Sequence, residues 1–158
     1  MLSLAVWLAG LQAVKRQRLR LRQLSQCVEL IQTVAVEIRY GNIPIRSILR
    51  SASLNEAFDT LKFLKGREES ASDFSADWQR RVEGDPTLSL KREEKAILIR
   101  FGRSLGTTDT ENQLILCERF RAQLNQCLES AAARQTENKR LLLGGTAAAA
   151  MLLFALIL

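Results

Sequence analysis

The last third of the chain, residues 108–158, constrains the fold most, because it predicts one long helix whose character changes along its length. Thr108 stands three residues before Glu111, a spacing typical of a helix N-terminus where two side chains cap free backbone amides. Apolar residues then recur three and four positions apart as far as Ala131, which predicts a helix face packed against a partner. Every residue of 141–158 except Thr146 is apolar or small, so the same helix is predicted to end in a membrane.

Charged residues are confined to the middle of the chain. The sequence has 23 Lys and Arg and 17 Asp and Glu residues, a formal net charge of +6, and none of them lies in residues 1–14 or 141–158. A membrane-spanning helix needs about 20 apolar residues, so the second segment is nearly long enough and the first is short. We predict an N-terminal membrane anchor at residues 1–14, a cytoplasmic helical bundle at 15–140 and a C-terminal membrane helix at 141–158.

The cations beside the two apolar segments predict the orientation. A cleavable signal peptide carries its positive charges before the apolar core, whereas here they follow it, so a retained anchor is the preferred interpretation. Whether residues 1–14 cross the bilayer completely is left open by their length. Since Lys and Arg flanking a membrane segment stay on the cytoplasmic side, the central domain is predicted to be cytoplasmic. The predicted membrane-surface cations are Lys15, Arg16, Arg18, Arg20, Arg22, Lys139 and Arg140.

A second amphipathic helix follows the N-terminal segment. Its seam has a heptad spacing and consists of Leu21, Leu24, Val28, Ile31, Ala35 and Ile38. Such a seam requires a partner helix. Because the first and last helices would leave the same membrane face, we expect them to pack antiparallel. A second copy of the chain is the alternative partner, since a heptad seam alone does not separate the two cases.

Capping and turn signals divide the middle of the chain into four further helices. Gly41 and Pro44 end the first helix, and the next two are predicted at residues 44–50 and 53–65. A helix introduced by Ser70 and Ser72 is ended by residues 84–86, and another covers residues 90–105, with Gly106 as its cap. No segment alternates with the period of a strand. The predicted fold class is therefore all-α, a six-helix bundle with an N-terminal and a C-terminal membrane helix.

The composition argues against catalysis. The chain has no His, the commonest general base and metal ligand, and no Gly-rich loop of a phosphate-binding form. Cys27, Cys117 and Cys127 lack the close pairing of a zinc site and are expected to be buried, reduced thiols. We predict no catalytic, cofactor-binding or metal-binding residues, and a protein that is not an enzyme.

The basic run at residues 15–22 favours lipid as its partner over nucleic acid. Cations that directly follow an apolar segment are explained by anionic headgroups and by membrane topology. No aromatic residue is interleaved with them to stack on bases. We predict contact with membrane lipid and no binding of nucleic acid.

Three parts of the sequence resemble the stage III sporulation protein AB family of endospore-forming bacteria. These are Glu37-Ile38-x-Tyr40-Gly41-x-x-Pro44, the pair Phe74 and Trp78, and Phe101-Gly102-Arg103-Ser104-Leu105-Gly106 followed by Asp109 and Gln113. Their order and spacing, with the two apolar ends, fit over essentially the whole chain. Thr108 stands where the family commonly has Ser, which preserves the hydroxyl, and residues 66–81 match loosely.

The resemblance implies a membrane protein of the mother cell, in an assembly that joins mother cell and forespore and is similar to secretion systems. It implies a fold similar to the six-helix cytoplasmic domain of the type II secretion platform protein, the F component. The implied partners are a secretion-type ATPase, stage III sporulation protein AA, and other membrane proteins of that assembly. The expected function is a non-enzymatic platform that docks this ATPase. The alternative is a membrane-anchored, self-associating helical structural protein.

The most specific motif of the resemblance has two interpretations. Its residues are Phe101, Gly102, Leu105, Gly106, Asp109 and Gln113. They could contact a partner, or they could supply core residues, a helix cap and the start of the next helix. The structural interpretation is preferred, because capping and packing explain each residue type at its position.

Overall fold

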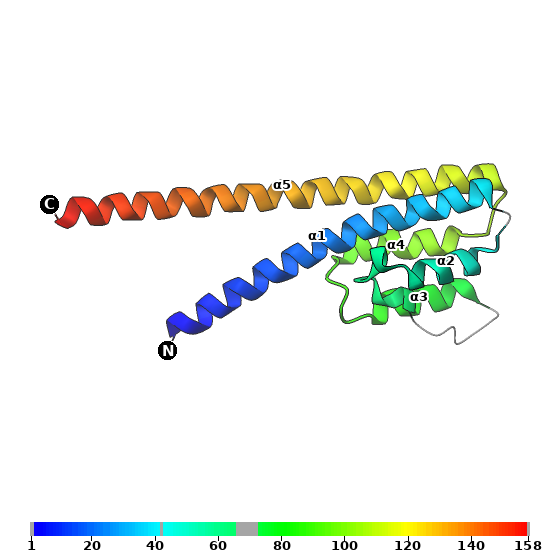
Figure 1. Ribbon diagram of the computed structural model, residues 1–158, viewed down its shortest axis with the longest axis horizontal. Helices are drawn as coiled ribbons and strands as arrows, with labels where there is room; N and C mark the ends of the chain where they lie inside the picture. Colours follow the sequence, from blue (N-terminus) through cyan, green and yellow to red (C-terminus); the bar gives the residue numbers. More distant parts are fainter. Residues whose placement is uncertain (1, 42, 66–72, 158) are drawn as a thin grey trace. The chain divides into compact units, whose positions relative to one another are not determined.

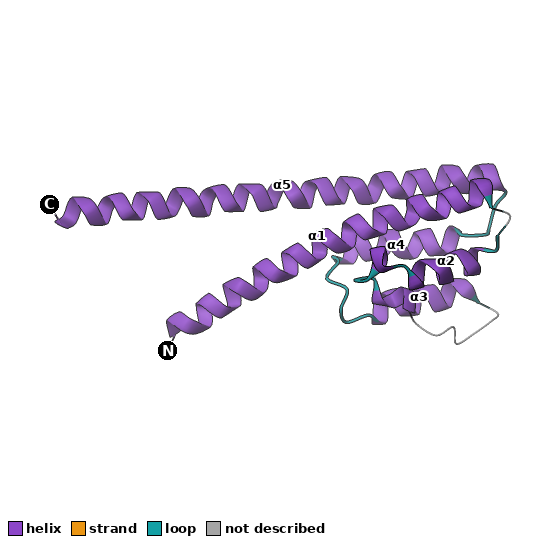
Figure 2. Ribbon diagram, viewed as in Figure 1, coloured by secondary structure: helices purple, strands orange, loops and turns teal. Residues whose placement is uncertain are grey.

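The computed structural model describes the backbone of residues 2–41, 43–65 and 73–157, and their side chains except those of residues 2–9, 11 and 138–157. The α-helices are α1 (Leu2–Tyr40), α2 (Ile45–Leu54), α3 (Phe74–Gly84), α4 (Arg92–Ser104) and α5 (Thr110–Ile157), and two short 3-10 helices, η1 (Glu56–Phe58) and η2 (Lys62–Lys65), follow α2 (Figure 1). The described residues contain no strand (Figure 2). The all-α prediction is therefore confirmed, although five α-helices replace the predicted six.

The chain divides into two compact units, residues 1–128 and 129–158. The second unit consists of the C-terminal part of α5, and the first holds every other element. Within the part of the chain that the structure describes, no helix is both long and apolar enough to span a membrane. The side chains of residues 141–158, and most of those of residues 1–14, lie outside the described residues, so the two membrane segments stay predictions.

The ends of α1 and α2 follow the turn signals of the sequence. α1 ends at Tyr40, and the Gly41 amide donates to the Glu37 carbonyl at 2.8 Å. Pro44, with φ of −57°, precedes the first residue of α2. The fixed backbone angle of Pro suits this position, since its missing amide would have no helical partner. α2 continues to Leu54, one turn beyond the predicted end.

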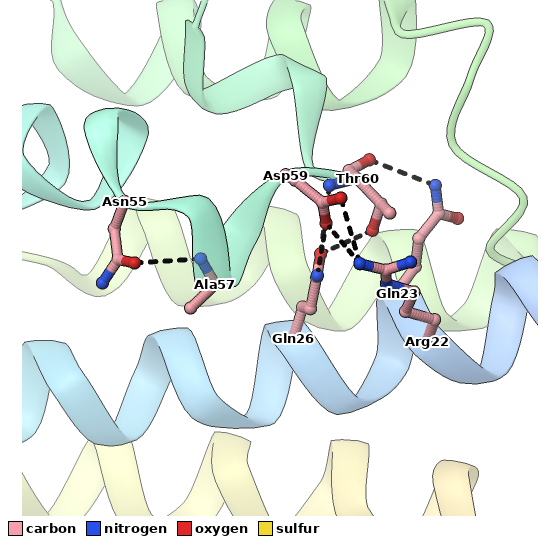
Figure 3. Close-up of polar contacts among 7 residues, drawn as sticks. All are labelled: Arg22, Gln23, Gln26, Asn55, Ala57, Asp59 and Thr60. Carbon is pink, nitrogen blue, oxygen red and sulfur yellow. Dashed lines mark hydrogen bonds and ion pairs between the residues drawn. The ribbon is translucent and has the colours of Figure 1, made fainter.

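The predicted helix over residues 53–65 does not form, and this prediction is wrong. Asn55 ends α2 in an extended conformation, with φ of −80° and ψ of 127°. Its side-chain oxygen accepts the Ala57 amide at 2.9 Å (Figure 3). A short polar side chain that bonds a nearby backbone amide competes with helical hydrogen bonding, and here it starts η1 in place of a longer helix.

The rest of this segment is held by acceptors from other elements. The Thr60 amide donates to Gln26 Oε1 of α1 at 3.3 Å, and the Phe63 amide donates to Asp85 Oδ2 at 2.9 Å. Amides paired in this way have no need of helical carbonyl partners. Leu54 is exposed, whereas three other apolar residues of this segment are buried, namely Phe58, Leu61 and Leu64.

α1 buries a wider face than its heptad seam predicts. Leu24 and Ile31 are fully buried as expected, and so are three residues outside the seam, Cys27, Leu30 and Val34. Figure 3 shows the reason: residues 55–60 lie on one side of α1, and the yellow ribbon of α5 lies on the other. As far as Leu128, α5 runs beside α1 in the opposite direction (Figure 1), and within this single chain Leu24 and Ile31 of the seam are fully buried while its other residues are half-buried.

Both ends of the turn between α4 and α5 are well defined. α4 ends at Ser104, and Gly106 has φ of +75°, so Gly106 ends the helix as predicted. α5 begins at Thr110, and the Asp109 carbonyl accepts the Gln113 amide at 2.9 Å. Asp109 therefore occupies the capping position that the sequence assigned to Thr108. An Asp is at least as suitable there, since its charge favours a helix N-terminus.

Candidate functional site

Trp78 of α3 lies at the centre of an aromatic cluster. It is 1% exposed, and its Nε1 donates to the Leu98 carbonyl of α4 at 2.9 Å. The ring centroid lies 5.3 Å from that of Phe63, 5.9 Å from Phe74 and 6.2 Å from Phe101. Aromatic contacts at these distances add to the free energy of apolar burial. The cluster therefore joins η2, α3 and α4.

Gly102 allows α4 to approach this cluster closely. A Cβ atom on Gly102 would lie 2.1 Å from Cδ1 of Trp78, so no larger residue fits without moving the indole. The preceding residue, Phe101, is fully buried, and its ring centroid lies 6.0 Å from that of Phe120 on α5. Leu105 is buried as well. These three motif residues, Phe101, Gly102 and Leu105, are core residues.

Gln113 holds the turn between α4 and α5. Its Oε1 accepts the Gly106 amide at 3.0 Å, and its side chain is 3% exposed. Asp109, by contrast, is exposed, and its Oδ1 accepts the side-chain amide of Asn112 at 2.6 Å. The Gln113 contact fixes the first turn of α5 against the end of α4.

A groove opens beside this turn. It has a volume of about 370 Å³, and its walls come from the turn that follows α1 and the turn that follows α4. Ile43, Pro44 and Ile45 contribute apolar surface, while Thr108 and Gln113 contribute polar atoms. Ile43 is 48% exposed and the neighbouring Tyr40 is 81% exposed. Two turns far apart in the sequence thus form one concave surface with exposed apolar side chains at its edge. We call it the turn groove.

A sequence model of the stage III sporulation protein AB family matches residues 1–158. The chain belongs to this family. A solved structure described as stage III sporulation protein AB is similar to it, with 25% sequence identity and a TM-score of 0.63. The similarity covers 75% of this chain and 98% of that one. No curated protein matches the chain.

The turn groove brings together two of the strings that carry the resemblance to the sporulation family. Gly41 and Pro44 come from the first string, and Gly106 and Gln113 from the most specific one. Sequence spacing could not show that they meet, because more than sixty positions separate them. The third part of the resemblance, Phe74 and Trp78, belongs to the aromatic cluster. Through Trp78 it contacts α4 at Leu98 and Phe101.

The cysteines of this family member are free thiols of low reactivity. Burial raises the pKa of Cys27 to about 12 and that of Cys117 to about 11. Because the thiolate is the nucleophile and the metal ligand, thiols with raised pKa values are poorly suited to either role. Among the described residues, no group of three or more His, Cys, Asp and Glu could hold a metal ion. The turn groove is the concave surface of the described residues that we consider as a candidate site.

The predicted membrane-surface cations fall into two groups. Lys15, Arg16 and Arg18 are exposed on α1. Two others have carboxylate partners: Arg20 pairs with Glu94 of α4, and Arg22 pairs with Asp59 at 3.0 Å. Lys139 and Arg140 lie outside the described side chains. Of this basic run, the first three residues are therefore the ones free to face lipid.

Two buried amides of α1 were missed by the sequence reasoning. Gln23 donates to the carbonyls of Thr60 and Thr87 and accepts the Ser89 amide at 2.7 Å. Gln26 donates to Asp59 Oδ1 at 2.8 Å and accepts from Thr60 (Figure 3). The signal available in the sequence was that Gln23 and Gln26 stand three positions apart, beside the apolar seam. Together they attach two loops to α1.

Proposed function

We propose that this chain is a non-enzymatic platform in a sporulation-specific, secretion-like channel between mother cell and forespore. Residues 1–14 and 141–158 hold it in the mother-cell membrane, and the helical domain between them faces the cytoplasm. The turn groove docks the secretion-type ATPase of the same assembly, stage III sporulation protein AA. Membership of the sporulation family supports the setting, and the meeting of two motif strings in one groove supports docking.

The turn groove has the physical properties of a docking site. Exposed aromatic side chains beside a concave surface are typical of the residues that contribute most to protein–protein affinity. The exposed Tyr40 directly precedes Gly41, which lines the groove, and Ile43 contributes an exposed apolar side chain to the lining itself. The buried contact between Gln113 and Gly106 keeps the groove in shape before a partner arrives. A preformed surface reduces the ordering cost of binding.

The test measures the affinity of the purified ATPase for the full chain in lipid nanodiscs. We expect Ile43→Ala to weaken binding about tenfold, because Ile43 is exposed and lines the turn groove. Ile115→Ala is the matched control, because Ile115 is the same residue type and is 60% exposed but does not line the turn groove. Equal affinities for the two variants would exclude the groove as the docking site. Failure of the unaltered chain to bind would exclude ATPase docking.

A further inference from the structure

We infer that the first turn of α4 extends the basic part of α1 into one cationic face that binds anionic lipid headgroups. This lipid face consists of Lys15, Arg16 and Arg18 on α1 and Lys91, Arg92 and Lys95 at the start of α4. The inference rests on the proposed membrane placement of the chain. It adds a second element, distant in sequence, to the surface that meets the bilayer.

A buried ion pair fixes the start of α4 beside the basic run. Arg20 Nε donates to Glu94 Oε2 at 3.1 Å, and a second nitrogen of the same guanidinium bonds Glu94 Oε1. Glu94 is 3% exposed on its side chain, and its Oε2 also accepts the Lys91 amide at 2.7 Å. A two-pronged contact of this kind sets orientation as well as distance. Lys91 is therefore held close to the turn of α1 that carries Arg18.

The same end of the domain includes α5. Burial raises the pKa of the Cys127 thiol, Glu94 raises it further, and the charges of Arg20 and Lys91 oppose the rise. Cys127 of α5 therefore lies within electrostatic range of Arg20 and Glu94. The ion pair itself joins α1 and α4 at this end of residues 1–128, next to the uncharged N-terminal segment that is proposed to enter the membrane.

The cations of this end are available for a ligand. Lys91 and Arg92 are exposed, and among the described residues neither forms an ion pair. Arg92 and Lys95 line a shallow hollow of about 390 Å³. Glu83 at the hollow and Glu93 on α4 are the nearby carboxylates, and Arg20 neutralises Glu94. Positive charge thus exceeds negative charge on the exposed surface around the first turn of α4.

Lipid headgroups fit this face better than a compact anion does. The N-terminus of α4 already carries a carboxylate, because Glu94 accepts the Lys91 amide, so the attraction of this face for anions comes from its long cationic side chains. Such side chains keep their charges at the membrane surface and are attracted to anionic lipids within a Debye length. The three cations of α1 follow the apolar segment directly, so the face is continuous with the membrane boundary.

The test uses the full chain in nanodiscs of phosphatidylcholine, with or without one quarter phosphatidylglycerol. Acylation of each lysine by a water-soluble reagent is followed by mass spectrometry. We expect Lys91 to react several-fold more slowly beside the anionic lipid, because contact with headgroups shields the amine from the reagent. Arg92→Glu should remove most of this slowing, whereas Arg39→Glu, the same charge reversal at the opposite end of α1, should preserve it.

The lysines separate failure of this inference from failure of the membrane proposal. Slowing at Lys15 with no slowing at Lys91 would overturn the lipid face and leave the membrane anchor intact. Absence of slowing at both would overturn the proposed membrane placement as well. Slowing at Lys91 that survives Arg92→Glu and high salt would show that shielding is not electrostatic, and would also contradict the inference.

Discussion

At the scale of single residues, the absence of a side chain at Gly102 shapes the domain. The indole of Trp78 occupies the space that a Cβ atom would need, while its Nε1 donates to the Leu98 carbonyl. Packed interiors tolerate added volume poorly, because neighbouring side chains must leave their preferred rotamers. The glycine in the last turn of α4 is thus explained by packing against a neighbouring helix, and not by backbone conformation.

Gly102→Ala should therefore destabilise the domain. We expect a loss of about 1–3 kcal/mol in the free energy of unfolding, the usual range for overpacking. Gly84→Ala is the matched control, because nothing lies within 4 Å of a Cβ atom at the end of α3. Chemical unfolding of the full chain in detergent, followed by Trp fluorescence, measures both. A Gly102→Ala variant as stable as the control would contradict the packing described.

At the scale of elements, α1 organises the first unit through polar as well as apolar contacts. Gln23 and Gln26 pair with backbone groups of the segment before η2 and of the loop that follows α3. Buried backbone groups that lose such partners pay a desolvation cost. The two amides therefore determine where these irregular segments lie on α1.

Gln23→Ala should loosen both segments together. It removes three hydrogen bonds, and we expect a loss of stability of about 1–3 kcal/mol, because backbone groups are left without partners. Hydrogen exchange of the Ser89 amide, which donates to Gln23, should become faster. Gln32→Ala, at an exposed position of the same helix, is the control. Unchanged exchange at Ser89 in the Gln23 variant would show that the loop is held by other contacts.

The helices were predictable from the sequence where local signals agreed with tertiary packing. Pro44, Gly84 and Gly106 ended or preceded helices at the expected places, and the helix predicted over residues 90–105 is observed as α4, Arg92–Ser104. Residues 53–65 differ because their amides bond to Gln26 and Asp85, which lie far away in the sequence. The local sequence pattern of a segment carries no information about hydrogen-bond partners that lie so far away in the chain.

The candidate site was predictable only in part for the same reason. The motif residues were identified by resemblance. The structural interpretation places Phe101 and Leu105 in the core, and both are buried; it makes Gly106 a helix cap, and Gly106 has φ of +75°. The turn groove was not predicted, since it depends on two turns meeting in space. Gln113, a polar residue with a buried structural contact, has no simple sequence signature.

At the scale of the whole molecule, the two proposed surfaces lie at opposite ends of α4. The lipid face includes Lys91 and Arg92 before and at the first turn, and the turn groove includes Gly106 just after the last turn. A helix of 13 residues separates them by about 20 Å. Such a separation suits a platform that holds the membrane at one end of its domain and a partner at the other.

The most direct test of the account is hydrogen exchange of the full chain in nanodiscs, with and without the secretion-type ATPase. The account predicts slower exchange on binding at the amides that line the turn groove, with little change in α3; these are the amides of Gly41, Ile43, Ile45, Gly106, Thr108, Thr110 and Gln113. Contact reduces solvent access to exposed amides, so the docking surface is identified by its protection. Protection confined to other elements, or none at a concentration where the ATPase is bound, would contradict docking at this groove.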